Sequence, residues 1–432
     1  MDTSVAVLVI TFILFLLINV PIAITIIAST LLTMLFTVDA LPTVTTIAQR
    51  ISAGMNSFAL LAIPLFILSG YLMGQGGIAK RLIGFARVIV GRLPGGLALV
   101  NVIACALFGS VSGSAVAATS AIGGFMIPAM EKEGYDREFS TAVTITASTT
   151  GLLIPPSNIL IIFSLASGGV SIAALFIGGY LPGLLVVGAL MIVCSIYAKK
   201  QGYPIDEEIT SHQAVSNLLG AIPSLLLIFL ILGGIIGGFV TPTEAGAIAV
   251  LYSLLLSMLL YREIKPRDLP GILEKTVATT SIVMLLIGAS AAMSWLLSYE
   301  SFPQMISAAI LDVTAEIIII LILVNILLLA VGTFMDITPA VLIFTPILMP
   351  VMESIGISTL HFGIMMILNL SIGLCTPPVG SVLFVGCSIG KTRITDVIKP
   401  LIPMYFAMLA VLALVIYFPA LSEALPKALD LY

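Results

Sequence analysis

Two short segments interrupt long apolar stretches with side chains that can supply oxygen ligands. Residues 110–114 contain three serines and a glycine, and residues 332–338 place a glycine and two threonines around Asp336. Hydroxyl, carbonyl and carboxylate oxygens are the ligands that hard cations bind. A carboxylate inside an apolar stretch is costly to bury and is a functional candidate by default. These segments predict a Na⁺ site, with Asp336 as a cation ligand or a proton carrier.

Two proline pairs, residues 155–156 and 377–378, mark further breaks in apolar stretches. Proline ends or kinks a helix, and the exposed helix ends offer amides to anions and carbonyls to cations. The two pairs stand 222 positions apart, as do the similar segments 128–134 and 350–356. One shared offset for two proline-bearing motifs indicates the internal duplication that is typical of transporters.

The overall composition indicates which medium surrounds this chain. It has 432 residues, of which 60% are hydrophobic and 9% charged, whereas soluble domains are about 45–50% apolar and about 25% charged. Lipid is therefore the surrounding medium, which excludes a soluble enzyme. A net charge of −4 offers no basic surface for nucleic acid. The four cysteines are expected to be core residues, and His212 and His361 are expected in loops.

The apolar runs predict an all-α polytopic membrane protein built from two repeats of five spans each. Residues 1–198 form the first repeat, a cytoplasmic linker follows at 199–217, and residues 218–422 form the second repeat. The first apolar stretch is either two helices, at 3–19 and 21–38, or one long kinked helix. A retained span is expected at the N-terminus, because no basic region precedes it.

Each repeat is expected to contain one re-entrant helical hairpin and one proline-broken helix. The hairpins are predicted at 95–130 and 315–352, and the broken helices at 139–169 and 360–390. A single helix over residues 95–130 would be about 54 Å long at 1.5 Å per residue. A bilayer core is only about 30 Å thick, so a hairpin that enters and leaves on one side fits better.

The placement of basic residues decides between five and four spans in each repeat. With five, 15 of the 17 lysines and arginines lie on one side, and only Arg50 and Lys427 on the other. With four, the split is 9 against 8. The positive-inside rule favours five, which puts both termini in the periplasm and inverts the repeats. No basic residue need lie in a span core, so an anionic substrate would depend on hydroxyls, helix N-termini and bound cations.

Other interpretations of the same residues remain open. Serine and glycine clusters also let membrane helices pack closely, and Asp336 could simply cap a half-helix. Glu244 is explained by helix capping, with a functional role as the alternative. An intramembrane hydrolase would need a base beside a serine or a second facing carboxylate, and neither is evident. A proton-coupled carrier or an exporter of organic anions is the closest rival, and a structural scaffold would not need paired helix breaks.

The motifs in order resemble the large membrane subunit of tripartite ATP-independent periplasmic (TRAP) transporters, of the DctM-like ion transporter superfamily. The likeness covers almost the whole chain and lies in segments 112–114, 128–130, 154–157, 241–245 and 332–336, and in Asn369 and 376–380. It implies a sodium-driven secondary symporter that imports sialic acid, a C4-dicarboxylate or a similar carboxylate by an elevator mechanism. It implies no enzymatic activity and no cofactor other than Na⁺ as the coupling ion.

The resemblance also implies partners, a location and site residues. The partners are a small four-helix membrane subunit and a periplasmic substrate-binding protein, and the location is the bacterial inner membrane. Sodium-binding residues carried over from the pattern are Ser110, Ser112, Gly113, Ser114, Pro155, Asn158, Gly332, Thr333, Asp336, Thr376, Pro377 and Gly380. Substrate-binding residues are Ser114, Pro156, Ser157, Asp336, Thr338, Pro378 and Ser381.

Overall fold

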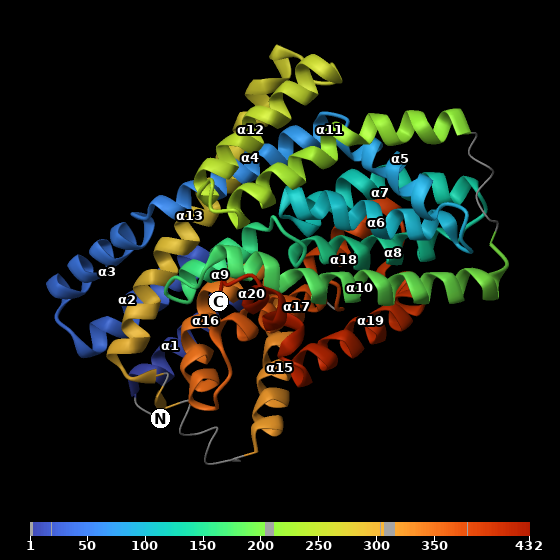
Figure 1. The fold of residues 1–432 in the computed structure, drawn as a ribbon. Helices are drawn as coiled ribbons and strands as arrows, with labels where there is room; N and C mark the ends of the chain where they lie inside the picture. The colour runs from blue at the N-terminus through green and yellow to red at the C-terminus, as the bar shows by residue number, and fades with distance from the viewer. Residues whose placement is uncertain (1–2, 19, 204–210, 303, 306–315, 378) are drawn as a thin grey trace.

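The computed structural model describes residues 3–18, 20–203, 211–302, 304–305, 316–377 and 379–432. All regular elements in these ranges are helical (Figure 1). Eight of the described helices are long and apolar enough to cross a membrane. The prediction of an all-α polytopic membrane protein is therefore confirmed.

The N-terminal region consists of three helices followed by a fourth that leads to the centre. Helices α1 (Thr3–Leu17) and α2 (Ile22–Thr37) are separate and pack against each other, which resolves the open alternative in favour of two. Pro21 stands at the start of α2, where its missing N–H costs nothing. Helix α3 (Ala40–Met55) packs on α13 at the left of Figure 1, and α4 (Ala62–Gln75) follows the short 3₁₀ turn Phe58–Leu61.

Helix α5 (Ile78–Val90) lies where the sequence indicated only a basic stretch. Ile78, Leu82, Ala86 and Val90 are buried on one face at four-residue spacing. This pattern is that of an amphipathic helix, whose basic side chains occupy the opposite face.

Each range predicted as a hairpin contains two helices that meet at a short break. The first pair is α6 (Gly96–Ser112) with α7 (Ala115–Lys132), and the second is α15 (Ile317–Phe334) with α16 (Ile337–Ser354). The first arms end, and the second arms begin, at positions that are 222 residues apart. The duplicated sequence motifs therefore coincide with duplicated helix boundaries.

Each range predicted as a broken helix contains two helices separated at the proline pair. Helix α8 (Arg137–Thr149) continues into the 3₁₀ turn Thr150–Leu152, and α9 (Asn158–Ala166) begins after the proline pair. In the second half, α17 (Thr359–Gly373) is followed by α18 (Ser381–Gly390). His361 belongs to the first turn of α17 and His212 to α11, so the expectation that both lie in loops is wrong. Each histidine stands beside polar residues, and for this reason the sequence did not show that a helix begins there.

The remaining helices complete the molecule. They are α10 (Ile172–Gln201), α11 (Ser211–Ile236), α12 (Pro242–Leu255), α13 (Leu269–Tyr299), α19 (Ile394–Tyr417) and α20 (Ala420–Ala428). Helix α12 continues as a π-helical turn over Leu256–Leu260, and a 3₁₀ turn at Pro266–Asp268 precedes α13. Helices α10 and α11 extend into both ends of the predicted linker 199–217.

Helices α4, α11, α12 and α13, here called the framework helices, are joined by buried and half-buried hydroxyl contacts. Ser69 on α4 lies 3.1 Å from Ser253 on α12. Tyr71 on α4 lies 2.9 Å from Thr279 on α13. Ser224 on α11 lies 3.0 Å from Tyr261, which follows α12.

A second set, α6–α9 with α15–α18, is here called the hairpin helices, and it has its own polar contacts. Asn101 on α6 donates to Thr144 on α8 at 2.7 Å, and Asn369 on α17 donates to Asn325 on α15 at 2.8 Å. Arg137 on α8 donates to the carbonyl of Gly390 on α18. Each hairpin is thus tied to its own broken helix, and the two halves are tied to each other. The framework helices meet this set chiefly where α13 packs on α16 and α4 on α6.

Candidate functional site

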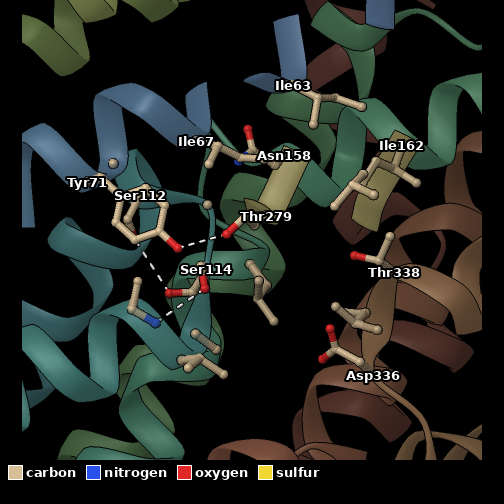
Figure 2. Close-up of a pocket in the computed structure, with 18 of the residues that line it drawn as sticks. Ile63, Ile67, Tyr71, Ser112, Ser114, Asn158, Ile162, Thr279, Asp336 and Thr338 are labelled. Atoms are coloured by element: carbon tan, nitrogen blue, oxygen red, sulfur yellow. Dashed lines mark hydrogen bonds between the residues drawn. The ribbon is translucent and has the colours of Figure 1, made fainter. Parts of the chain in front are cut away.

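A cavity of about 180 Å³ lies where the two hairpin tips approach each other (Figure 2). Its walls come from α4, α13, α9 and both tips. The lining includes Ile63, Ile67, Gly70, Tyr71, Ser112, Gly113, Ser114, Asn158, Ile162, Thr279, Val283, Asp336, Ile337, Thr338 and Leu374. Segments remote in sequence, including both hairpin tips, therefore line one cavity.

The tip of the first hairpin is shaped by a glycine in the left-handed region. Gly113 has φ of 63°, and a Cβ added there would lie 2.7 Å from the side chain of Asn158. Ser114 caps α7 by accepting from the amide of Ala117 at 3.2 Å, and Ser112 donates to the Ser114 carbonyl at 3.4 Å. Glycine permits both the turn and the close approach, so the Ser112 and Ser114 hydroxyls and the Asn158 side chain lie close together at this tip.

The tip of the second hairpin carries a carboxylate that faces the cavity. Asp336 stands at the N-cap position of α16 but forms no side-chain capping hydrogen bond, and Ser381 donates to its Oδ1 at 3.5 Å. Figure 2 shows Asp336 and Thr338 across the open space from Ser114. No lysine or arginine occurs among the described lining residues. The carboxylate therefore has no basic side chain in the cavity wall to neutralise it.

Several predicted site residues are not among the residues that line the cavity. The hydroxyls of Ser110, Ser157, Thr333 and Thr376 each donate to a backbone carbonyl three to five residues earlier. These bonds hold the backbone near each break and leave oxygen lone pairs available. None of Pro155, Pro156 and Pro377 is a lining residue, and Pro378 lies outside the described residues.

The glycines near the breaks serve close packing. Gly109 on α6 and Gly151 face each other so closely that a Cβ on Gly151 would lie 2.3 Å from the Gly109 Cα. In the second half, a Cβ on Gly373 would lie 2.6 Å from the Cα of Gly332. The packing interpretation of small residues therefore holds for these glycines, alongside the cavity formed by the serines. A Cβ on Gly380 would lie 2.5 Å from the carbonyl oxygen of Leu374.

The framework side of the cavity was not predicted from the sequence. Tyr71 and Thr279 meet at 2.9 Å on the wall opposite Asp336 and supply two hydroxyls (Figure 2). The only sequence signal was a tyrosine and a threonine within otherwise apolar spans, and periodicity alone does not say which way they face.

The geometry bears on two alternative assignments, those of Glu244 and of His361. Glu244 accepts from the Thr241 amide at 2.7 Å while the Thr241 hydroxyl accepts from the Glu244 amide at 3.3 Å. This capping box explains Glu244 as the start of α12. His361 is buried with Nδ1 2.7 Å from the Ser422 hydroxyl, and it is absent from the lining of the cavity. The described residues of the cavity therefore include no histidine base for its serines.

Residues 9–421 match the family model of the tripartite ATP-independent periplasmic transporter, DctM component. The chain belongs to this family. As a DctM component, it is the permease of a bacterial TRAP transporter and a multi-pass membrane protein.

Individual relatives agree with this membership. The chain is 52% identical to the YgiK protein of Salmonella typhimurium, over 95% of this chain and 94% of that one. It is 39% identical to the C4-dicarboxylate TRAP transporter large permease protein DctM of Rhodobacter capsulatus, over 93% and 94%. Its fold is similar to the crystal structure of the YdaH transporter of Alcanivorax borkumensis, with a TM-score of 0.64 and 14% identity over 88% of each chain.

Proposed function

We propose that this DctM component is the large membrane subunit of a sodium-coupled symporter that imports a small organic acid. The observation that carries the proposal is the cavity in which Asp336 faces hydroxyl-bearing residues with no basic side chain in the described lining. An unneutralised carboxylate beside neutral oxygens favours a bound cation. C4-dicarboxylates, which the Rhodobacter relative's name specifies, are the first candidates, and sialic acid is the second.

Two sodium sites would complete the two hairpin tips. The first would use Ser112, Ser114 and Asn158 with carbonyls around Gly113, and these groups already converge. The second would use Asp336 with oxygens of the segments 332–333 and 376–380. Bound Na⁺ would supply the positive charge that an anionic substrate requires beside Ser114 and Thr338. Coupling follows, because each ligand stabilises the state that binds the other.

Movement of the hairpin helices against the framework helices would carry the site across the membrane as an elevator. Support comes from the contacts within each set, since Tyr71 binds Thr279 inside the framework and Asn325 binds Asn369 inside the hairpin set. Contacts of this kind are what each set would need in order to move as a unit. The repeats would be inverted, so that the two hairpins open toward opposite sides of the bilayer.

The other subunits of the proposed transporter would be separate chains. A small four-helix membrane subunit would pack against the framework helices, and a periplasmic binding protein would deliver the substrate. The complex would lie in the inner membrane, and both termini of this chain would be periplasmic, because that orientation puts most basic residues in the cytoplasm.

Uptake into proteoliposomes tests the proposal. The complete transporter is reconstituted with its binding protein, and radiolabelled succinate and sialic acid are offered under a Na⁺ gradient, a pH gradient, or ATP alone. Uptake that needs the inward Na⁺ gradient and the binding protein is expected. Uptake driven by the pH gradient would favour the rival assignment of Asp336 as proton carrier, and uptake driven by ATP alone would contradict any secondary transport mechanism.

A further inference from the structure

A second and larger cavity, of about 490 Å³, lies next to the central one and is here called the anteroom. It falls within the range of about 300–1,000 Å³ that is typical of ligand pockets. Its lining includes Arg50, Gly54, Ser57, Leu60, Leu165, Ala166, Ser290, Ser294, Trp295, Ser298, Leu342 and Pro346. We propose that the anteroom is an anion-binding site that recruits the carboxylate substrate from the periplasm before it reaches the central cavity. This inference rests on the proposed function.

The two cavities follow one another along the same helices. On α13 the central lining ends at Val283 and the anteroom lining begins at Ile287. On α9 the succession is Ile162 to Leu165. Each step is three or four residues, which is about one helical turn or 5.4 Å.

Helix α16 and the α4 region show the same succession. On α16, Thr338 lines the central cavity and Leu342 lines the anteroom. Near the start of α4, Ile63 lines the central cavity and Leu60 lines the anteroom. Four walls that advance together by one turn place the anteroom directly in line with the central cavity. A solute that leaves the anteroom along these helices would next reach the central cavity.

The anteroom carries a positive charge where the central cavity carries a negative one. Arg50 is exposed and its guanidinium lies 5.3 Å from the centre of the Trp295 ring. This contact with an aromatic face fixes the side chain while leaving its N–H donors free for a ligand. The described lining contains no carboxylate. Arg50 is also one of only two basic residues on the face predicted to be periplasmic.

Hydroxyls extend from the arginine toward the central cavity. Ser290, Ser294 and Ser298 repeat every four residues on α13, which puts them on one face of that helix. Ser290, the member nearest the central cavity, is 4% exposed, and its Oγ has no hydrogen-bond partner among the described residues. Buried polar atoms are normally paired, so this hydroxyl is available to a passing ligand.

In this proposal a carboxylate passes from the anteroom to the central cavity, and a different positive charge binds it in each. In the anteroom the guanidinium of Arg50 and the serine hydroxyls bind the anion. In the central cavity the counter-charge is supplied by bound cations. A guanidinium at the mouth attracts anions without retaining them at depth, and a cavity lined by one sign of charge raises their local concentration.

Charge-selective labelling tests the anteroom without knowledge of the substrate. Ser294→Cys is made in right-side-out membrane vesicles, because the four native cysteines are buried. Its labelling rates are compared for an anionic sulfonatoethyl and a cationic trimethylammonium-ethyl methanethiosulfonate. Arg50→Gln is expected to lower the ratio of anionic to cationic rate on the order of tenfold, whereas Arg50→Lys retains most of it.

A matched control reports on folding and orientation. Ala424→Cys on the exposed face of α20 is predicted to face the periplasm away from the anteroom, so its ratio should be unchanged by Arg50→Gln. An equal ratio for Ser294→Cys with and without Arg50 would overturn the proposal. So would labelling of Ser294→Cys only in inside-out vesicles, because the anteroom would then open to the cytoplasm.

Transport provides the second readout. In the reconstituted transporter, Arg50→Gln is expected to raise the KM for the succinate-loaded binding protein about fivefold with Vmax within about twofold. Arg267→Gln, an exposed arginine in the turn before α13, should leave both unchanged. If the parent transporter shows no sodium-driven uptake of any acid, the proposed function fails, while the labelling ratio still decides whether the anteroom recruits anions.

Discussion

At the scale of single residues, the site depends on a few polar groups held at helix breaks. Ser112, Ser114, Asn158 and Thr338, all candidate site residues from the sequence, line the cavity, and Asp336 faces it without a basic partner among the described lining residues. These residues were predictable because a polar group inside an apolar stretch is conspicuous. Tyr71 was not, since its role depends on which side of α4 faces the hairpin tips, and only tertiary packing decides that.

Replacement of Asp336 by asparagine removes the negative charge and keeps the shape. We expect Asp336→Asn to reduce sodium-driven uptake at least tenfold, because a neutral amide binds a cation far more weakly. The midpoint of thermal unfolding should not fall. Uptake and unfolding are measured on the same detergent-purified protein, with Asp430→Asn at the exposed C-terminal end as control. Parent-like uptake by Asp336→Asn would remove this carboxylate from the mechanism.

Gly113 can be tested against a glycine with similar backbone strain and free space. Gly113→Ala puts a Cβ 2.7 Å from the Asn158 side chain at φ of 63°, whereas Gly134→Ala has φ of 85° and no atom within 4 Å. A left-handed alanine costs about 1–2 kcal/mol at either position. Only Gly113→Ala should also displace the tip, so we expect its apparent affinity for Na⁺ to fall severalfold. Equal affinities in the two variants would show that the tip tolerates the added methyl group.

At the scale of elements, strongly apolar helices and their breaks were predictable, and amphipathic helices were not. Both hairpins were placed within a few residues, because long apolar runs with glycine and proline breaks leave few alternatives. Helices α3 and α5 were missed, since half of each surface is polar and a search for continuous apolar runs passes over them. The details of helix crossings, such as Gly109 against Gly151, were inaccessible because they depend on three-dimensional approach.

The crossing of α6 with the broken helix predicts a sharp difference between two glycines. Gly151→Ala would put a Cβ 2.3 Å from the Gly109 Cα, and overpacking of this kind costs about 1–3 kcal/mol. Gly124→Ala, on the exposed face of α7 with no atom within 4 Å, should be neutral or stabilising by up to about 1 kcal/mol. Thermal unfolding in detergent measures both. A Gly151→Ala protein as stable as the parent would mean that the crossing relaxes freely.

At the scale of the whole molecule, the distribution of basic residues predicts on which side of the membrane each loop lies. The positions of the helices alone do not give this orientation. The proposed inversion of the repeats places Lys80 on α5 and Lys265 before α13 on the same, cytoplasmic side. Both are exposed. Lys80→Cys and Lys265→Cys should therefore react with a membrane-impermeant maleimide only in inside-out vesicles. Reaction of either one in right-side-out vesicles would contradict the five-span arrangement.

The burial of all four cysteines has a consequence for life under oxidative stress. Cys105, Cys194, Cys375 and Cys387 are free thiols, and the most exposed of them is 6% accessible. Thiol oxidation requires an accessible thiolate. Disulfide-forming oxidants such as diamide should therefore leave uptake unchanged, which an uptake assay after diamide treatment would measure. A permease of this kind would keep its activity while exposed thiols on other proteins are being oxidised.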